Sequence, residues 1–401
     1  MLSIGIFTYS TRPRGSVVHA THLAEALARR GHDVTVYALS KEGDRLYREL
    51  ECRVVLLPAR PAPSEPDALI EQRITEVASG LAALRPIHDV YHAEDCLAAS
   101  GLLRLGEELR PRPLVRTLHH LERFESVFLQ ACQRRSILEA DSVACVSQLS
   151  QRDLERELGV RAPIIGNGVE LGRFEAFDAE AVTALRARCG IDPGDNVVLS
   201  VGGIEPRKNS LNALQAMAGL LARHEGLHWL IAGGASIWEH DRYRQEFEQM
   251  RAKLATGVRQ RIVQLGPVSE QQLTACYGAA QILLCPSLQE GFGLCVLEAL
   301  ASGVPVVVSR GEPFSEYLDE SCASFVEPSS AGEIARAVEQ LLDDQRLCAA
   351  RAVTGRQRVR DFSWERVAIE HERLYGELAR SKKIGRVTDR HAPKSEGSIH
   401  A

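Results

Sequence analysis

Several common signatures are absent from this 401-residue sequence, and each absence excludes a class of protein. The ten cysteines include no Cys-x-x-Cys pair, so neither a zinc site nor a thioredoxin-like motif is indicated. No Walker-type Gly-x-x-x-x-Gly-Lys-Ser/Thr occurs, which argues against ATP hydrolysis of that kind. No Asp-x-Asp pair occurs, so a metal-bridged diphosphate has no obvious anchor. No apolar run reaches the roughly 18–20 residues that span a bilayer.

The bulk composition is that of a soluble globular protein, with 45% hydrophobic and 25% charged residues. The net charge of -5 argues against a general nucleic-acid binder, which is usually basic. The N-terminus starts with the strand-like "LSIGIFTYS" and has no positive segment followed by an apolar one, so we expect no signal peptide and a cytoplasmic location. The length predicts two domains of about 150–200 residues.

Strands alternate with helices along the whole chain, which predicts parallel sheets covered by helices. In the first half we expect strands at residues 4–9, 33–39, 52–59, 88–95, 113–120, 142–147 and 162–168. The pattern restarts near residue 167, with strands in "NVVLSVGG", "LHWLIAGG", "RIVQLGPV", "ILLCPS", "PVVVS" and "ASFVEP". The sequence therefore predicts two doubly wound, Rossmann-like domains in tandem.

We expect the boundaries of these domains at 1–166 and 167–361. The amphipathic stretch "DFSWERVAIEHERLYGEL" predicts a C-terminal helix that reaches about residue 380 and crosses back to the first domain. Residues 381–401 show no apolar periodicity and are expected to be a disordered tail.

Sheets of this kind often bind nucleotides at the carboxyl ends of their strands. The loop after the first strand, "TYSTRPRGSVVH", contains a single glycine in place of Gly-x-Gly-x-x-Gly, which disfavours an NAD-dependent oxidoreductase. A diphosphate can instead be held without metal by cationic side chains and a helix N-terminus. Arg207 and Lys208 in "GGIEPRKN" offer the charges, and the loop "QEGFG" leads into a helix near Gly293.

Two carboxylates, Glu290 and Glu298, stand at the ends of the apolar stretch "EGFGLCVLE". We expect Glu290 in the loop above a strand end and Glu298 in the second turn of the following helix. Carboxylates accept hydrogen bonds from pairs of sugar hydroxyls, so both are candidate ligand contacts. The alternative is that Glu290 caps the helix and Glu298 faces solvent.

Taken together, these stretches resemble the retaining glycosyltransferases of family four, which have the GT-B fold. The stretch "PSLQEGFGLCVLEALASGVPVV" is similar to the family's Glu-x7-Glu motif. Other stretches agree in order and extend the resemblance to residue 378: "HDVYHAED", "RTLHH", "IIGNGVELGRF", "SVGGIEPRKN", "LGPVSEQQLTACYGAA" and "FSWERV". The resemblance implies two Rossmann-like domains that face each other across a cleft.

The resemblance also implies a role for each matching residue. Glu290 would contact hydroxyls of the donor sugar, Glu298 would hold the ribose, and Lys208 with Arg207 would neutralise the diphosphate. His119 would line the site near the sugar. We therefore take Glu290, His119 and Lys208 as the catalytic candidates. The donor-binding candidates are Arg207, Lys208, Glu290, Glu298, the amides of Phe292, Gly293 and Leu294, the backbone of Val268 beside the base, and Gly15 from the first domain.

Some residues depart from the family pattern or have a structural alternative. Gly203 stands where the family often has arginine, a charge that Arg207 can supply, and the first loop has one glycine where many members have two. That second departure concerns the acceptor side. His120 is expected to be structural, and His92 and Asp95 either line an acceptor pocket or end a surface strand. The arginines at 104, 110, 112, 116, 123, 134 and 135 form either a solvated face or a contact for anionic lipid.

These observations predict an enzyme that moves a sugar from a nucleoside-diphosphate sugar to an acceptor hydroxyl, with retention and without a metal or other cofactor. The acceptor is a carbohydrate, a lipid or a small molecule, and peripheral contact with the inner face of a membrane stays open. Two alternatives are a nucleotide-sugar epimerase or hydrolase on the same fold, and a non-catalytic sugar-nucleotide sensor.

Overall fold

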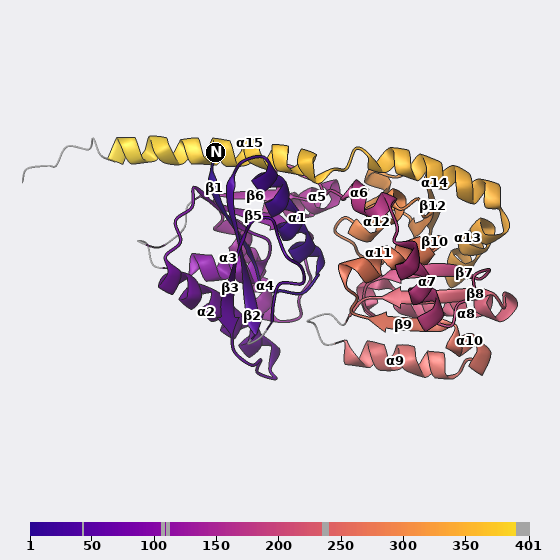
Figure 1. Cartoon of the computed structure of the whole chain (residues 1–401). Helices are drawn as coiled ribbons and strands as arrows, with labels where there is room; N and C mark the ends of the chain where they lie inside the picture. The colour runs from indigo at the N-terminus through magenta and orange to yellow at the C-terminus, as the bar shows by residue number, and fades with distance from the viewer. Residues whose placement is uncertain (42–43, 106–108, 110–112, 235–239, 390–401) are drawn as a thin grey trace, which may run out of the picture. The chain divides into compact units, whose positions relative to one another are not determined.

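The computed structural model describes residues 1–41, 44–105, 109, 113–234 and 240–389 of the chain. The chain forms two compact units (Figure 1). The first comprises Met1–Val146, Gln151–Ile165 and Glu365–Ala401, and the second comprises Ser147–Ser150 and Gly166–Trp364. Along the chain, the second unit is thus inserted between two parts of the first.

The first unit contains a six-stranded parallel sheet in the order β3-β2-β1-β4-β5-β6. The chain winds outward from β1 in one direction and then from β4 in the other, so the switch point lies between these two strands. Gly5 of β1 pairs with Thr35 of β2 on one side and with Tyr91 of β4 on the other. The strands are β1 (Ser3–Thr8), β2 (Asp33–Lys41), β3 (Arg53–Ala59), β4 (Val90–Ala93), β5 (Leu114–Leu118) and β6 (Ser142–Cys145).

Helices of the first unit pack their apolar sides on this sheet. Phe7 and Tyr37 stack with ring centroids 4.6 Å apart, and they share a core cluster with Leu81 and Leu102 from helices. The helices are α1 (Gly15–Arg29), α2 (Pro66–Leu84), α3 (Cys96–Leu103), α4 (Val127–Leu138), α5 (Gln148–Leu158) and α15 (Trp364–Asp389).

Helix α15 returns the end of the chain to the first unit. Glu372 accepts hydrogen bonds from Arg30 at 2.8 and 2.7 Å and lies 2.7 Å from Nε2 of His32. Tyr375 lies fully buried with its hydroxyl 2.5 Å from Nδ1 of His92. The helix continues to Asp389, so residues 381–389 are helical where a disordered tail was expected, and residues 390–401 lie outside the described residues.

The second unit repeats the same winding in its own six-stranded parallel sheet, ordered β12-β11-β10-β7-β8-β9. Its switch point lies between β7 and β10, because the chain winds outward from each of them. All four residues of β10 are buried, as is typical of parallel strands covered on both faces. The strands are β7 (Asn196–Val201), β8 (Leu227–Ala232), β9 (Ile262–Gly266), β10 (Ile282–Cys285), β11 (Val306–Ser309) and β12 (Ala323–Val326).

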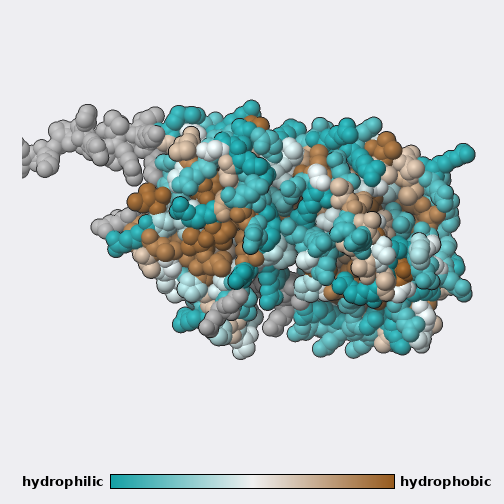
Figure 2. Space-filling model, viewed as in Figure 1, coloured by the Kyte–Doolittle hydropathy of each residue, from teal (hydrophilic) through white to brown (hydrophobic). Residues whose placement is uncertain are grey.

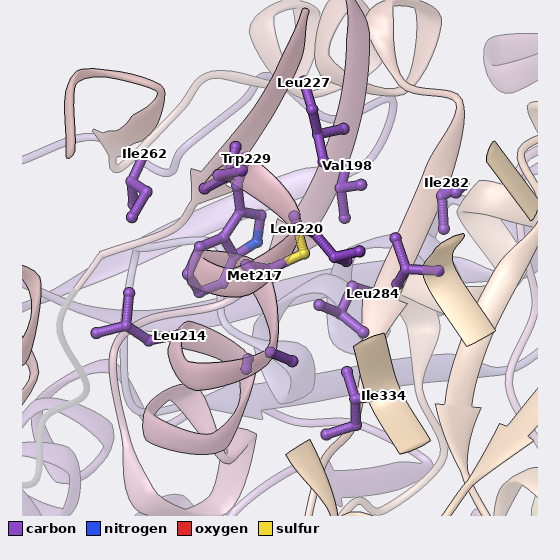
Figure 3. Packing of buried hydrophobic residues seen from close by; sticks show 14 of the residues in the cluster. Val198, Leu214, Met217, Leu220, Leu227, Trp229, Ile262, Ile282, Leu284 and Ile334 are labelled. Atoms are coloured by element: carbon purple, nitrogen blue, oxygen red, sulfur yellow. The ribbon is translucent and has the colours of Figure 1, made fainter. Parts of the chain in front are cut away.

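The core of the second unit is built from helix α8 and the sheet. Trp229 and Met217 are the centre of the cluster in Figure 3, and the Trp229 indole donates to Ser200 Oγ at 3.0 Å. Helix α11 begins with a capping box formed by Ser269 and Gln272. The helices are α6 (Leu171–Glu175), α7 (Ala179–Arg188), α8 (Ser210–Arg223), α9 (Asp241–Ala252), α10 (Thr256–Gln260), α11 (Glu270–Ala279), α12 (Leu294–Ala301), α13 (Ala331–Asp343) and α14 (Gln345–Val359), with short 3-10 turns η1 (Pro206–Lys208) and η2 (Phe314–Glu316).

One expected strand is wrong. Residues 162–168 make a single bridge between Ile164 and Cys145, because the chain leaves the edge of the first sheet there and passes into the second unit. At Gly168 this segment packs closely against the backbone near Trp364. A Cβ at this position would lie 2.5 Å from the backbone nitrogen of Trp364, so a larger residue would not fit.

Candidate active site

In the second unit, two cations and one carboxylate meet at the carboxyl ends of the strands. Lys208 Nζ lies 2.7 Å from Glu290 Oε2, and Arg207 Nη1 lies 3.0 Å from Glu290 Oε1. Arg207 also donates to Glu205 at 2.9 Å. The Lys208 and Glu290 side chains are only 14% and 13% exposed, so solvent screens this pair weakly. The structure therefore joins three residues that the sequence singled out separately.

Asn209 fixes the loop that carries these cations. It adopts the left-handed conformation with φ 58°, and its side-chain amide donates to the carbonyls of Pro286 and Pro328 at 3.0 and 2.6 Å. The neighbouring Gly202 has φ 134°, and a Cβ there would come within 3.0 Å of Lys208 Cε. The lysine stem therefore lies directly against the backbone that leaves β7.

Lys208 is protonated and positively charged near neutral pH. Burial by itself lowers the pKa of Lys208, but the negative charge of Glu290 outweighs it and raises the pKa above the ordinary value. The lysine lines a small cavity of about 20 Å³ together with Gly202, Gly203, Cys285 and Ser287. These residues lie at or just after the ends of β7 and β10, so the cavity lies at the switch point, where doubly wound sheets bind ligands.

The loop from Glu290 to α12 is held by aromatic side chains. Gly293 precedes α12 with φ 95°, and a Cβ at this position would lie 2.6 Å from Phe314. The Tyr317 hydroxyl donates to the Phe292 carbonyl at 2.9 Å, and the two rings stack at 4.9 Å. Because Gly293 precedes the helix, the alternative that Glu290 is its cap is wrong.

Glu298 lies in the second turn of α12, as expected. The Tyr277 hydroxyl lies 2.7 Å from its Oε2 and 3.1 Å from the Cys295 carbonyl. Burial raises the pKa of Glu298 above its ordinary value, while the hydrogen bond from Tyr277 opposes that rise. The alternative of a freely solvent-facing Glu298 is therefore wrong. Val268 lies partly buried in the turn between β9 and α11.

In the first unit, His119 follows β5 and binds a carboxylate that the sequence did not single out. Its Nε2 lies 3.0 Å from Oε2 of Glu94, whose other oxygen lies 2.9 Å from Nδ1 of His19. Glu94 and His19 are fully buried, and the His119 side chain is 18% exposed. Within the described residues, these three form the one group whose ligand atoms, all within 4.8 Å of one another, could hold a metal ion.

His92 and Asp95 are interior residues, so the alternative that they end a surface strand is wrong. The His92 ring is fully buried between Thr117 Oγ1 at 2.6 Å and the Tyr375 hydroxyl at 2.5 Å. Asp95 caps helix α3 by accepting from the amide of Ala98 at 2.7 Å, and it also accepts from the amide of Tyr9 at 2.9 Å. Burial raises the pKa of Asp95 to about 6.

Gly15 and His120 lie close in the sequence to His19 and His119, respectively, but they are not part of the cluster around Glu94. Gly15 is the first residue of α1, and no atom lies within 4 Å of the position that its Cβ would take. His120 pairs with Glu122, and the two side chains are 33% and 30% exposed.

The arginines of the first unit do not form one solvated face. Arg116 is buried in β5 and donates to the Thr117 carbonyl, which contradicts its assignment to a surface. Arg104 and Arg135 pair with Glu71 and Glu139. Arg123 lies 4.0 Å from Glu157, Arg134 is exposed, and Arg110 and Arg112 lie outside the described residues.

Apolar side chains reach the surface of the first unit, where brown areas interrupt the teal in Figure 2. Its most exposed large apolar side chains include Ile87 at 89% and Val127 at 85%. In the part of the chain that the structure describes, no helix combines the length and apolarity required to cross a bilayer.

Both halves of the chain match families of known proteins. Residues 182–358 match the family described as glycosyl transferases group 1, and residues 13–173 match glycosyltransferase family 4. The D-inositol 3-phosphate glycosyltransferase of Acidothermus cellulolyticus is 30% identical over 357 residues, covering 82% of this chain and 78% of that protein. The chain belongs to the group 1 glycosyltransferases.

Other relatives and solved structures agree with this assignment. The glycosyltransferase is 25% identical to the MMP alpha-(1->4)-mannosyltransferase of Mycolicibacterium hassiacum, covering 96% of this chain and 99% of that one. Sucrose-phosphate synthase from Thermosynechococcus elongatus superposes with a TM-score of 0.78 at 23% identity, covering 95% of this chain and all of that chain. Anabaena Alr3699/HepE in complex with UDP and glucose gives 0.78 at 20% identity, covering 94% and 100%. The fold of this glycosyltransferase is therefore GT-B, as predicted.

Four residues that shape the two candidate regions were not predicted from the sequence. Glu94, Asn209, Tyr277 and Tyr317 each hold a predicted residue or its loop in place. Glu94 stood inside the quoted stretch "HDVYHAED", and its position directly after an apolar strand was the available signal. The tyrosines gave no signal, because their partners lie on separate elements.

Proposed function

We propose that this glycosyltransferase transfers a sugar from a nucleoside-diphosphate sugar to an acceptor hydroxyl, with retention at the anomeric carbon and without a metal. The observation that carries the proposal is the cluster of Arg207, Lys208 and Glu290 at the switch point of the second sheet. Two cations that keep their charge at neutral pH suit a diphosphate leaving group, whose developing charge is the main obstacle to the reaction. The absence of an Asp-x-Asp pair in the sequence favours this metal-free arrangement.

The donor would lie on the second unit. Lys208 and Arg207 would bind the diphosphate, and the amides of Phe292, Gly293 and Leu294 would add hydrogen bonds at the start of α12. Glu290 would accept hydrogen bonds from the sugar hydroxyls, because a carboxylate is an acceptor with about four lone-pair sites. Glu298 would take the ribose, and Val268 would lie beside the base.

The chemical step would proceed on one face of the sugar. The acceptor oxygen forms a bond to the anomeric carbon while the bond from that carbon to the phosphate oxygen breaks. The electron pair leaves with the diphosphate, and the departing phosphate oxygen takes the proton of the acceptor hydroxyl. Lys208 and Arg207 stabilise the charge that develops on the diphosphate, and His119 with Gly15 would shape the sugar and acceptor side.

The relatives suggest which substrates to try first. One structural neighbour was solved with UDP-glucose, and several relatives bear the name D-inositol 3-phosphate glycosyltransferase. We therefore propose a UDP-linked hexose as the first donor and a phosphorylated polyol or sugar as the first acceptor. If the acceptor is a lipid, we further propose that the protein contacts the inner face of a membrane peripherally.

The experiment is a thermal-shift screen of UDP-, GDP-, ADP- and TDP-sugars with the full chain. A donor at about 100 times its dissociation constant should add roughly 2.7 kcal/mol of stability. The best donor is then incubated with candidate acceptors, and proton NMR reads the anomeric configuration of the product. Turnover of the donor without any acceptor would identify an epimerase or hydrolase, and binding without turnover across all acceptors would identify a sensor.

A further inference from the structure

Among the described carboxylates of the first unit, Glu94 is the most enclosed. It directly follows β4, has no exposed surface, and lies at the switch point of its sheet. His19 from α1 approaches one carboxylate oxygen at 2.9 Å, and His119 approaches the other at 3.0 Å. A third imidazole, that of His92, lies 3.6 Å from Oε1.

The protonation state of Glu94 follows from these neighbours. Burial by itself raises the pKa of Glu94, but the histidines around it outweigh that effect and hold the pKa well below its ordinary value. An ionised carboxylate only accepts hydrogen bonds. The nitrogens that face it, Nδ1 of His19 and Nε2 of His119, must therefore both carry a proton.

This requirement selects one tautomer of His119. Burial lowers the pKa of His119 to about 4, so the ring is neutral at pH 7 and carries a single proton. That proton belongs to Nε2, because Nε2 is the nitrogen facing Glu94. Nδ1 is then left with a free electron pair and can accept a hydrogen bond from a hydroxyl.

The surrounding residues keep this geometry rigid. Both nitrogens of His92 are engaged, one by Thr117 of β5 and one by Tyr375 of α15. His371 donates from Nδ1 to the Val367 carbonyl at 2.9 Å and stacks on His92 at 5.4 Å. Contacts from β5 and α15 therefore fix the His92 ring of β4 beside Glu94.

We propose that Glu94 is a positioning residue, which locks His119 in the Nε2-protonated tautomer and so presents Nδ1 as a hydrogen-bond acceptor. The assignment of the tautomer uses only residues of the first unit and does not depend on the proposed function. Its consequence for catalysis rests on the proposed function, in which His119 receives a hydroxyl of the sugar or the acceptor. The alternative is that His19, Glu94 and His119 bind a divalent cation, which would require both facing nitrogens to be deprotonated.

The tautomer can be observed without any substrate. The full chain is labelled with 15N-histidine, and His119→Gln identifies the signals of His119 by their loss. We expect wild type at pH 7 to show a protonated Nε2 and an unprotonated Nδ1. Glu94→Gln should abolish this preference, because an amide can both donate and accept. Glu122→Gln is the matched control, since it changes the partner of the adjacent His120 and should leave the His119 signals in place.

Kinetics then test the consequence for catalysis. Glu94→Gln should lower kcat about tenfold, the loss that corresponds to one misplaced hydrogen bond in the transition state, and leave the KM for the donor almost unchanged. Glu94→Asp keeps the charge and should recover part of kcat together with part of the tautomer preference. Circular dichroism confirms that each variant folds.

Each outcome decides a separate point. Protonation of Nδ1 in wild-type His119, or an unchanged tautomer in Glu94→Gln, would overturn the proposal even in an inactive protein. The expected tautomer with an undiminished kcat in Glu94→Gln would remove the role in catalysis. Tight binding of Zn²⁺ in calorimetry, lost in His19→Gln, would show that the three residues are metal ligands. A protein without transferase activity but with the expected tautomer would refute the proposed function and keep the assignment of Glu94.

Discussion

Glu94 in the first unit and Glu290 in the second stand at corresponding places in two sheets of the same winding. Each follows the strand across the switch point from the first strand of its unit, β4 in one case and β10 in the other. Histidines surround Glu94, whereas Lys208 and Arg207 hold Glu290. Burial lowers the pKa of His92 and of His119 to about 4, so both rings are neutral at pH 7, whereas the side chains of lysine and arginine stay charged. The corresponding position therefore has neutral imidazoles in one unit and a permanent charge cluster in the other.

Replacing Glu290, the carboxylate held by Lys208 and Arg207, should have the largest effect on activity. Glu290→Gln removes the charge that holds both cations in place, and kcat should fall roughly 10²- to 10³-fold, as for other preorganised polar groups. The residue lies in a loop, so the folded state should persist. Steady-state kinetics with a donor from the thermal-shift screen measures the loss, and the exposed Glu320→Gln serves as the control. Turnover near that of wild type would remove Glu290 from the active site.

Removing one cation should weaken the binding of the diphosphate. Lys208→Ala should cost roughly 1–3 kcal/mol in the binding of a nucleoside diphosphate, the range for charge-assisted hydrogen bonds. Binding of the free nucleoside should stay constant, because it carries no phosphate. Calorimetry with both ligands makes the comparison, and the exposed Lys253→Ala is its control.

The double variant sharpens this prediction. Arg207→Ala should cost less than Lys208→Ala, and the two changes should be non-additive if both side chains grip one phosphate. Equal losses for the diphosphate and the nucleoside would mean that the loop is structural.

Mild acid should weaken the first unit more than the second. Among the described residues, burial lowers the pKa of His88, His92, His119 and His371 in the first unit, and of His228 in the second. A depressed pKa means that the unfolded chain takes up protons first as the pH falls, so stability is present above the unfolded pKa and is lost below it. Between pH 7 and 6 the loss is about 0.7 kcal/mol for a histidine whose folded pKa is about 4, such as His92 or His119.

Hydrogen exchange of the full chain at pH 7 and pH 6 tests this difference between the units. The amides of β4 and β5 should lose more protection than those of β7 and β10. Equal changes in both units would show that the histidines around Glu94 do not set the acid sensitivity.

Chelation should have the smallest effect of all. Activity should survive excess EDTA, because Lys208 and Arg207 supply the charge that a metal would supply to the diphosphate. The control is EDTA saturated with Mn²⁺. Complete loss on chelation, restored by Mn²⁺, would refute the metal-free reaction and would direct attention to His19, Glu94 and His119.

The sequence predicted most of the fold, because strands such as β10 are continuous apolar runs between turn residues. It also predicted that Glu290 lies in a loop and Glu298 in a helix, since Gly293 separates a strand from an apolar periodic segment. It did not predict the cluster around Glu94. His19 lies 75 residues from Glu94, and Tyr375 lies 283 residues from His92, so only the folded sheet and the return of α15 bring them together. It misassigned His92 for the same reason: a polar residue at a strand end gives no sign of a partner from a distant helix.

The return of α15 has a consequence for biosynthesis. The first unit is made of two separate parts of the chain, and His371 and Tyr375, which complete its buried polar cluster, belong to the part that is translated after the second unit. At roughly 5–20 residues per second, the inserted second unit separates the two parts of the first by on the order of ten to forty seconds. During that interval β4 and β5 have been synthesised, but Tyr375, the hydrogen-bond partner of His92, has not. The first unit can therefore be completed only after the second unit has been translated.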